Sequence, residues 1–225
     1  MTDTNALETP QLTSAEPQAK TIQSRYNYRQ ARQWLHERGR QMFGRAFSLH
    51  KEDVQVINQL LCYFLQDDMV APVVNIALDK GIMLAGPVGC GKTALMCLMR
   101  CLTQPGNRFL LKSCRQVSFE FIQDGYDILH RYCRSPLYAN ETSTICFDDL
   151  GAENNLKYYG NECNVMAEIL ATRYDHFCSR HLITHLTTNL GAAEIESVYG
   201  TRVRSRMREM FNLIAFEAES RDKRQ

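Results

Sequence analysis

An eight-residue glycine-rich segment constrains the fold of this chain more than any other part of its sequence. Residues 86–93 read GPVGCGKT, a complete match to the phosphate-binding loop pattern G-x-x-x-x-G-K-[ST]. A short apolar run precedes the segment at 82–85, and an apolar, helix-like run follows it at 94–99. At average composition the fixed positions coincide by chance in roughly one chain in a hundred of this length. With these flanks an ordinary glycine-rich turn is a poor explanation. The segment predicts a strand, a loop and a helix that bind a nucleoside triphosphate.

The residues of such a loop have defined tasks. The glycines allow successive backbone N–H groups to face a phosphate, and the N-terminus of the following helix adds partial positive charge. We expect Lys92 to reach the β- and γ-phosphates and the hydroxyl of Thr93 to ligate Mg²⁺. The predicted nucleotide-binding residues are Gly86, Pro87, Val88, Gly89, Cys90, Gly91, Lys92, Thr93 and Ala94.

The chain is long enough for one α/β domain with appendages. Of its 225 residues, 44% are hydrophobic and 23% charged, as in soluble globular proteins, and the net charge is +1. So small a charge gives no overall attraction to nucleic acid, and any such attraction must be local. The start of the sequence lacks the basic and apolar stretches of a secretory signal, and no apolar run approaches the roughly 20 residues that cross a bilayer. We therefore expect a cytoplasmic protein with reduced thiols and no membrane segment.

The nine cysteines do not have the spacing of a metal site. None forms the C-x₂-C pair that is typical of zinc ligands. We expect them to be small, buried apolar residues. Cys90 is a separate case because it lies in the loop, where the N-terminus of a helix lowers the pKa of a thiol and makes it sensitive to oxidation.

Three segments of the chain differ in composition. Residues 1–24 are rich in Thr, Gln, Glu and Pro without periodicity, which predicts a disordered tail. Residues 25–70 form a basic helical extension, with helices predicted at 26–47 and 53–65. Residues 71–225 form the expected nucleotide-binding domain. The first of these helices, at 26–47, contains one acid and five arginines. Either it contacts DNA or a partner protein, or it is only an exposed basic face packed on the core. Those arginines are Arg29, Arg32, Arg38, Arg40 and Arg45.

Strand-like and helix-like segments alternate along the rest of the chain. We predict helices at 119–132 and 165–177 and two short helices before the last strand. Such alternation predicts a doubly wound parallel sheet flanked by helices, the α/β architecture of P-loop NTPases. The predicted strands are 82–85, 108–112, 144–147, 182–187 and 212–216.

Polar residues at the ends of two later strands complete a hydrolytic site. The run ICFDD at 145–149 has the Walker B pattern, in which a carboxylate at the end of a strand supports Mg²⁺. This pattern assigns Asp148 to the metal and Asp149 to the polarisation of the attacking water. Asn189 ends the following strand, where it either orients that water or favours a turn. Glu153 either assists the reaction or is a solvated loop acid.

The order of four motifs resembles the AAA+ ATPases of the DnaC/IstB group, which are bacterial helicase loaders and transposition helper ATPases. The motifs are GPVGCGKT, ICFDDLGAE, LTTNL and YGTRVRSRMREM, and the resemblance covers residues 81–224. It implies that Asn189 is sensor 1. It also implies an arginine, in the segment ending S-R-[LM], that acts on the ATP of a neighbouring subunit. Arg206 matches this position and Arg202 is the alternative, although a basic surface helix would also explain the alternating arginines.

The chain departs from the wider AAA+ pattern at two points. Asp149 stands where many members have Glu, although paired Asp also occurs in the initiator-like branch. The sequence extends only a short way past the last predicted strand, so we expect no C-terminal helical lid, as is usual for the DnaC/IstB group. Arg221 or Arg224 in this tail either lies near the nucleotide or belongs to a frayed, charged terminus.

The resemblance implies an ATPase with Lys92, Asp149, Asn189 and Arg206 as its catalytic residues. Our main hypothesis is a helicase loader that self-associates, in an ATP-dependent way, into an oligomer or filament and acts on single-stranded DNA and a replicative helicase. The alternative is a transposition helper that recruits a transposase with the same core. A small-molecule kinase on this fold is less favoured, because the segment between the second strand and the Walker B run is short. A GTPase would require an N-K-x-D signature, which is absent from the sequence.

Overall fold

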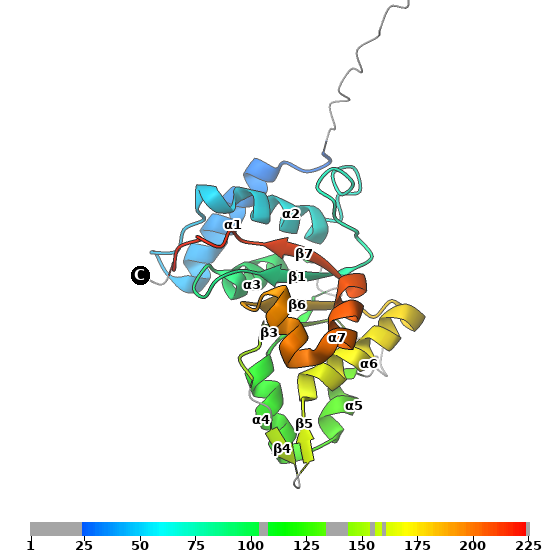
Figure 1. Ribbon diagram of the computed structural model, residues 1–225. Coiled ribbons are helices and arrows are strands. Elements are labelled where there is room, and N and C mark those ends of the chain that lie inside the picture. Colours follow the sequence, from blue (N-terminus) through cyan, green and yellow to red (C-terminus); the bar gives the residue numbers. More distant parts are fainter. Residues whose placement is uncertain (1–23, 104–107, 134–143, 154–155, 159–160, 224–225) are drawn as a thin grey trace, which may run out of the picture.

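The computed structural model describes residues 24–103, 108–133, 144–153, 156–158 and 161–223 (Figure 1). Of the tail predicted at 1–24, only Ser24 belongs to this part of the chain, and Arg224 lies outside it. A parallel sheet of five strands is covered by helices on both faces, which confirms the predicted α/β class. No helix among the described residues is long and apolar enough to cross a membrane.

The five strands lie in the order β2-β3-β6-β1-β7, and each neighbouring pair is parallel. Their carboxyl ends therefore meet at one edge of the sheet, where open α/β sheets bind their ligands. Since β6 lies between β1 and β3, the three motif-bearing strands are direct neighbours. The strands span Gly81–Ala85 (β1), Leu110–Ser113 (β2), Ile145–Leu150 (β3), Thr184–Thr188 (β6) and Phe211–Ala215 (β7).

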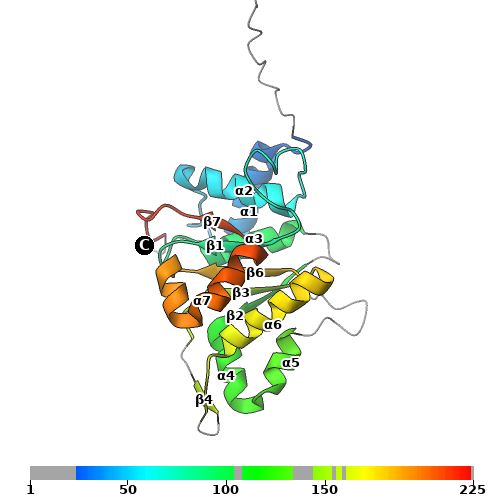
Figure 2. The same ribbon diagram turned by 45° about the vertical axis from the view of Figure 1, so that its right-hand side comes forward.

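Two groups of helices cover the two faces of the sheet, as Figure 2 shows from a second side. Along β3, Cys146 packs in the core beneath the first group, whereas Ile145 and Phe147 pack in the core beneath the second, as alternate side chains of a strand must. The first group contains α1 (Tyr28–Phe43), η1 (Lys51–Asp53), α2 (Val54–Phe64) and α3 (Lys92–Leu102). The second contains α4 (Cys114–Asp124), α5 (Asp127–Cys133), α6 (Val165–Arg180) and α7 (Ala192–Met210).

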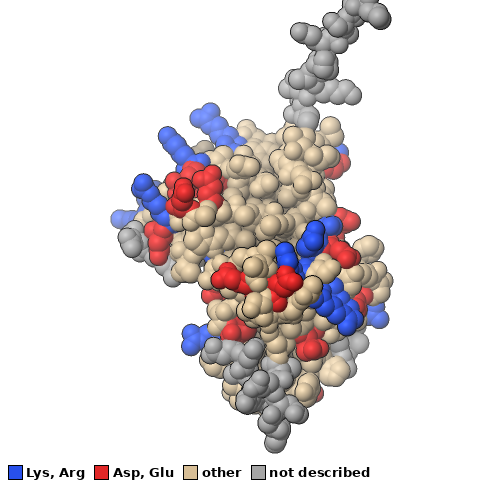
Figure 3. Space-filling view, viewed as in Figure 1, with Lys and Arg blue, Asp and Glu red and all other residues tan. Residues whose placement is uncertain are grey.

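The basic N-terminal helix packs on the same core as the phosphate-binding loop. Leu35 of α1 is fully buried in one cluster with residues of α2, α3 and β1. Arg32 points inward to Asn58 of α2, with 2.6 Å between the guanidinium nitrogen and the amide oxygen. The other four arginines of the predicted basic helix are exposed. Figure 3 shows basic side chains standing out on the side of the molecule where α1 and the start of α2 lie.

The secondary structure differs from the sequence prediction at several boundaries. The first helix ends at Phe43 rather than near residue 47. The helix predicted at 119–132 is two helices, because Gly125 has a φ of +58° that ends α4. The two short helices predicted before the last strand form α7, which bends at Gly200. A small antiparallel hairpin, β4 (Leu156–Tyr158) and β5 (Asn161–Cys163), was not predicted.

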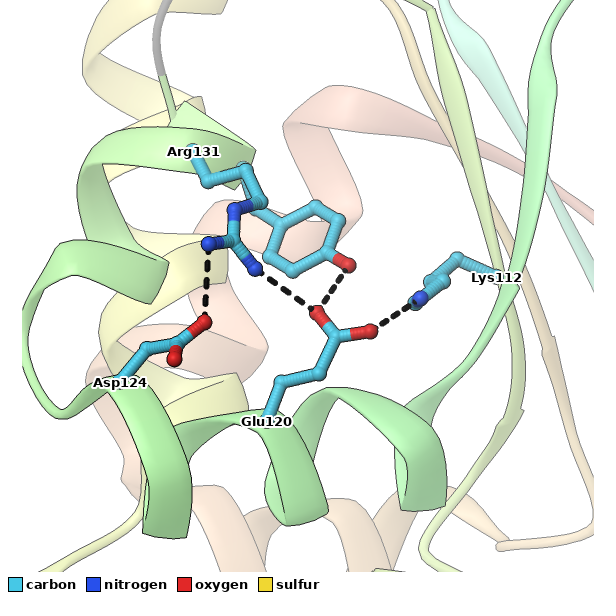
Figure 4. Close-up of polar contacts among 5 residues, drawn as sticks. Lys112, Glu120, Asp124 and Arg131 are labelled. Carbon is cyan, nitrogen blue, oxygen red and sulfur yellow. Dashed lines mark hydrogen bonds and ion pairs between the residues drawn. The ribbon is translucent and has the colours of Figure 1, made fainter.

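Glu120 joins the α4–α5 pair to the edge strand β2 (Figure 4). Its carboxylate accepts hydrogen bonds from Lys112 of β2 and, at 2.6 Å, from the hydroxyl of Tyr132 of α5. Arg131 lies 3.4 Å from the same carboxylate and 2.8 Å from Asp124. Burial alone would raise the pKa of Glu120, but the hydrogen bonds from Lys112 and Tyr132 outweigh it and hold this pKa below its usual value. The network fixes both helices to the outer edge of the sheet.

Candidate nucleotide-binding site

The predicted strand, loop and helix around GPVGCGKT are present. Strand β1 ends at Ala85, residues 86–91 form the loop, and α3 begins at Lys92. Gly89 has a φ of +83°, and a Cβ atom added there would lie 2.1 Å from the carboxylate of Asp222. The positive φ is what favours glycine here, since the Asp222 carboxylate is the end of a side chain that can shift. The loop leads directly into the N-terminus of α3, where partial positive charge favours an anion.

Lys92 is bent back over the loop. Its ammonium donates to the carbonyl oxygens of Gly86 and Pro87 at 2.8 and 2.9 Å, and only 7% of the residue is exposed. Four methylene groups separate the charge from the backbone, so the ammonium can move to a phosphate without a change in the helix. The positive charge of Lys92 is thus held beside the phosphate-binding loop.

Asp148 is the centre of a hydroxyl–carboxylate cluster. The Thr93 hydroxyl donates to its two carboxylate oxygens at 2.9 and 3.0 Å, which brings the two predicted metal ligands together. The Thr187 hydroxyl donates to the same carboxylate at 2.7 Å and accepts from the Asp149 backbone N–H at 2.8 Å. Thr187 was not predicted as a site residue. Within the described residues, no group of three or more His, Cys, Asp or Glu could hold a metal on its own.

Hydroxyl and carboxylate oxygens are the donors that Mg²⁺ prefers, and this ion usually takes one or two protein ligands with the rest from water and substrate phosphates. Thr93 and Asp148 fit that requirement as a pair. They also lie where the loop would place a phosphate. The pair therefore suits a metal that arrives with a nucleotide.

Asp149 projects from an irregularity at the end of β3. The register with β6 shifts between Phe147 and Leu150, and Asp149 has a φ of +60°. A left-handed conformation is uncommon for residues other than glycine, and such strain is often found in functional sites. Because of this bulge, the two successive acids face different groups. Asp148 contacts Thr93, whereas Asp149 is exposed towards the cavity.

A cavity of about 540 Å³ lies over the phosphate-binding loop. It is large enough for a nucleotide. Many predicted site residues line it: Val88, Gly89, Gly91, Lys92, Thr93, Ala94, Asp149 and Asn189. The other four predicted residues outside the arginines, Gly86, Pro87, Cys90 and Asp148, lie in the loop or behind Thr93 and are not among the lining residues.

One wall of this cavity was not predicted from the sequence. Phe43 at the end of α1 lines it together with Ala46, Phe47, Ser48 and His50 from the segment between α1 and η1, and Lys223 comes from the opposite end of the chain. The rings of Phe43 and Phe47 lie 5.4 Å apart between their centroids. Nothing in the local sequence pattern identifies these residues, because they reach the loop only through the packing of α1 on α2 and α3.

Cys90 does not have the reactive thiol that its position in the loop predicted. The residue is fully buried, and burial raises the pKa of its thiol more than the nearby Lys92 lowers it. Burial and the raised pKa both count against the oxidation hypothesis. Five of the eight cysteines whose side chains are described are buried, as predicted, whereas Cys97 and Cys101 are partly exposed and Cys178 is exposed; all eight are free thiols.

Glu153 fixes the loop after the Walker B strand. Its carboxylate accepts from the Gly151 backbone N–H at 2.8 Å and from the hydroxyl of Tyr199 of α7. Burial, together with the charge of Glu153, raises the pKa of Tyr199. Glu153 does not line the cavity, although its neighbours Gly151 and Ala152 do. Its contacts are those of a residue that holds the loop in place.

Arg206 lies away from the cavity, on the contact between α7 and α6. Its guanidinium donates to the carbonyl oxygen of Ala171 at 3.2 Å, lies 3.3 Å from Asp175 and stacks 4.8 Å from the centroid of the Tyr174 ring. Only 17% of its side chain is exposed. Arg202 is exposed on the same helix, and neither arginine lines the cavity of its own chain.

No protein-family model matches the chain, and no curated protein matches its sequence. Solved structures do share its fold. The DnaC helicase loader is 17% identical with a TM-score of 0.53, over 76% of this chain and 93% of that one. A Streptococcus pyogenes protein described as a primosome component is 18% identical with a TM-score of 0.54, over 76% and 83%. DnaI is 21% identical with a TM-score of 0.50, over 75% and 87%. The chain therefore shares the fold of these three structures.

Proposed function

We propose that this chain, whose fold is that of the helicase-loader structures, binds ATP with Mg²⁺ over its phosphate-binding loop and hydrolyses it. The observation that carries the proposal is the cluster in which Thr93 and Thr187 both donate to Asp148 beside the loop. A loop alone would account for phosphate binding. The cluster adds a place for the metal, and Asp149 and Asn189 in the same cavity add groups that can act on water.

Each polar residue has a task in this proposal. Lys92 leaves the two carbonyl oxygens that it contacts and neutralises charge on the β- and γ-phosphates. Thr93 and Asp148 would hold Mg²⁺, which would spread the charge that develops during phosphoryl transfer. Asp149 accepts a proton from the attacking water as general base. Asn189 orients that water from the end of the neighbouring strand, which limits the directions of attack.

The end of α1 and the segment between α1 and η1 provide the site for the base. Phe43 and Phe47 offer aromatic and apolar surface to a purine, and Ser48 and His50 offer polar groups. The only carboxylate among the described lining residues is Asp149, at the phosphate end. A guanine site would be expected to present an acceptor of this kind to the N–H groups of the base. The lining therefore favours adenine.

Arg206 is the predicted intersubunit arginine, and its guanidinium already has partners within its own chain. Arg206 can act on the ATP of a neighbouring subunit only if it leaves Ala171 and Asp175 of α6 when subunits meet. A guanidinium that arrives with a subunit couples hydrolysis to assembly. Arg202 is the alternative because it is already exposed on the same helix.

We further propose that the chain acts in the cytoplasm on DNA and on a replicative helicase, as an ATP-dependent oligomer. Support comes from the shared fold with the DnaC helicase loader and from the four exposed arginines near α1, which suit a phosphate backbone. A transposition helper is the alternative. Pull-down with the Asp149→Asn protein held in its ATP form separates the two: recovery of a replicative helicase supports the proposal, and recovery of a transposase overturns it.

Titration calorimetry with Mg-ATP tests the nucleotide site itself. The unaltered protein should bind, and Lys92→Ala should bind at least about 100-fold more weakly because the phosphates lose their main counter-ion. Lys80→Ala is the matched control, since this lysine precedes β1 and does not line the cavity. If the protein does not bind ATP, or if Lys92→Ala binds it equally well, the proposed function is wrong.

A further inference from the structure

The C-terminal segment returns across the phosphate-binding loop. After β7, Phe216 continues beside β1, where its backbone N–H donates to the Ala85 carbonyl oxygen at 2.9 Å. The chain then turns, and the Lys223 backbone N–H donates to the Gly89 carbonyl oxygen at 3.0 Å. The loop is thus in contact with residues more than 120 positions away in the sequence. No motif places them there.

The Lys223 side chain contacts the next peptide group of the loop. Its ammonium donates to the Cys90 carbonyl oxygen at 2.8 Å and pairs with the carboxylate of Asp53, the last residue of η1, directly before α2. Asp53 is almost fully buried, and only 16% of the Lys223 side chain is exposed. The ammonium also lies 5.0 Å from the centroid of the Phe216 ring. A flexible lysine is thereby held in one position.

Two hydrogen bonds from one residue fix two successive peptide planes of the loop. In a planar trans peptide the carbonyl oxygen and the N–H of the next residue point in opposite directions. A Gly89 carbonyl held by Lys223 therefore directs the Cys90 N–H away from the tail and towards the Pro87 carbonyl oxygen, to which it donates at 3.4 Å. A Cys90 carbonyl held by Lys223 does the same for the N–H of Gly91, a residue that lines the cavity. Orientation of these N–H groups decides how well the loop binds phosphate.

We propose that Lys223 is a positioning residue of the phosphate-binding loop, and that Asp53 holds it in place. The pair sets the direction of loop N–H groups before a nucleotide arrives, so less conformational entropy is lost on binding. Lys223 acts through the loop backbone and its charge stays paired with Asp53. This inference rests on the proposed nucleotide site and adds two residues to it that belong to none of its motifs.

The test compares ATP with adenosine, which lacks phosphates. Lys223→Met should weaken ATP binding about tenfold, the effect of one charge-assisted hydrogen bond, and should leave adenosine binding unchanged. Lys223→Arg keeps the charge and the donors and should recover most of the affinity for ATP. Lys51→Met makes the same substitution at an exposed lysine of η1 that does not line the cavity, and it should bind ATP like the unaltered chain.

Asp53→Asn distinguishes action through the loop from a direct contact with phosphate. If Lys223 positions the loop, freeing it from Asp53 should weaken ATP binding several-fold. If Lys223 contacts the phosphates itself, the same substitution should leave ATP binding unchanged or tighten it, and the inference is wrong. It is also wrong if Lys223→Met binds ATP normally, or loses adenosine as well as ATP. Failure of the unaltered chain to bind ATP would instead refute the proposed function.

Discussion

His185 of β6 makes the stability of this fold depend on pH. The residue is 3% exposed, and its Nδ1 accepts a hydrogen bond from the Ile82 backbone N–H of β1 at 3.1 Å. The rings of Tyr63, Phe64 and Phe109 surround it, with centroid distances between 5.1 and 5.6 Å. Burial, and secondarily the charge of Arg173, lowers the pKa of His185 to about 3. The imidazole is therefore neutral in the folded protein at any pH near neutrality.

The size of the effect follows from proton linkage. The unfolded histidine has an ordinary pKa of about 6.5, so below that pH the unfolded state binds a proton that the folded state does not. Stability from this group is fully present above about pH 6.5 and is lost as the pH falls towards 3. Each pH unit in that window removes about 1.4 kcal/mol. Between pH 8 and pH 5 the free energy of unfolding should fall by about 2 kcal/mol from His185 alone.

Urea unfolding of the unaltered chain and of His185→Asn, measured from pH 8 to pH 5, isolates this contribution. The variant is less stable at pH 8, because the ring leaves a space in the core. The difference between the two proteins should shrink by about 2 kcal/mol at pH 5, while the titration of the other five histidines cancels. A difference that stays constant across this range would refute the reasoning.

Three further predictions concern the site. Asn189→Ala should leave the dissociation constant for ATP unchanged and slow phosphate release about 10- to 100-fold, because water loses its orientation; an unchanged rate in a coupled phosphate assay would contradict this. Phe47→Ala should weaken binding of both ATP and adenosine about tenfold through lost ring contact, with pyrophosphate binding as the internal control; equal loss of pyrophosphate would show that the ring does not serve the base. Arg206→Ala should be inactive alone but regain turnover when mixed with Lys92→Ala, since each variant supplies what the other lacks; no recovery between folded variants would reject Arg206 as the intersubunit arginine.

The parts of the site that the sequence predicted are those in which a few adjacent residues dictate the geometry. GPVGCGKT fixes a turn between a strand and a helix, and Asp148 and Asn189 follow from strands that end at one edge of a parallel sheet. The α/β class was predictable for the same reason, since alternating strands and helices allow few other arrangements. The break at Gly125 was not, because the apolar periodicity continues through it.

The residues that were missed reach the site through tertiary packing. Phe47 faces the cavity because the segment after α1 runs past the N-terminus of α3, and Lys223 because the chain turns back after β7. Neither has a neighbour in sequence that belongs to a motif. Arg206 is the opposite case. Its motif is recognisable in the sequence, but its contacts within one chain are those of a helix residue packed on α6 and do not reach the site.

Single-turnover hydrolysis by Asp149→Asn tests the central claim most directly. The account predicts that this variant binds Mg-ATP with the affinity of the unaltered chain, because Thr93 and Asp148 are intact, and that its rate of phosphate release falls at least about 100-fold with the loss of the general base. Equal rates for the two proteins, at equal ATP occupancy, would contradict the claim that this cavity hydrolyses ATP.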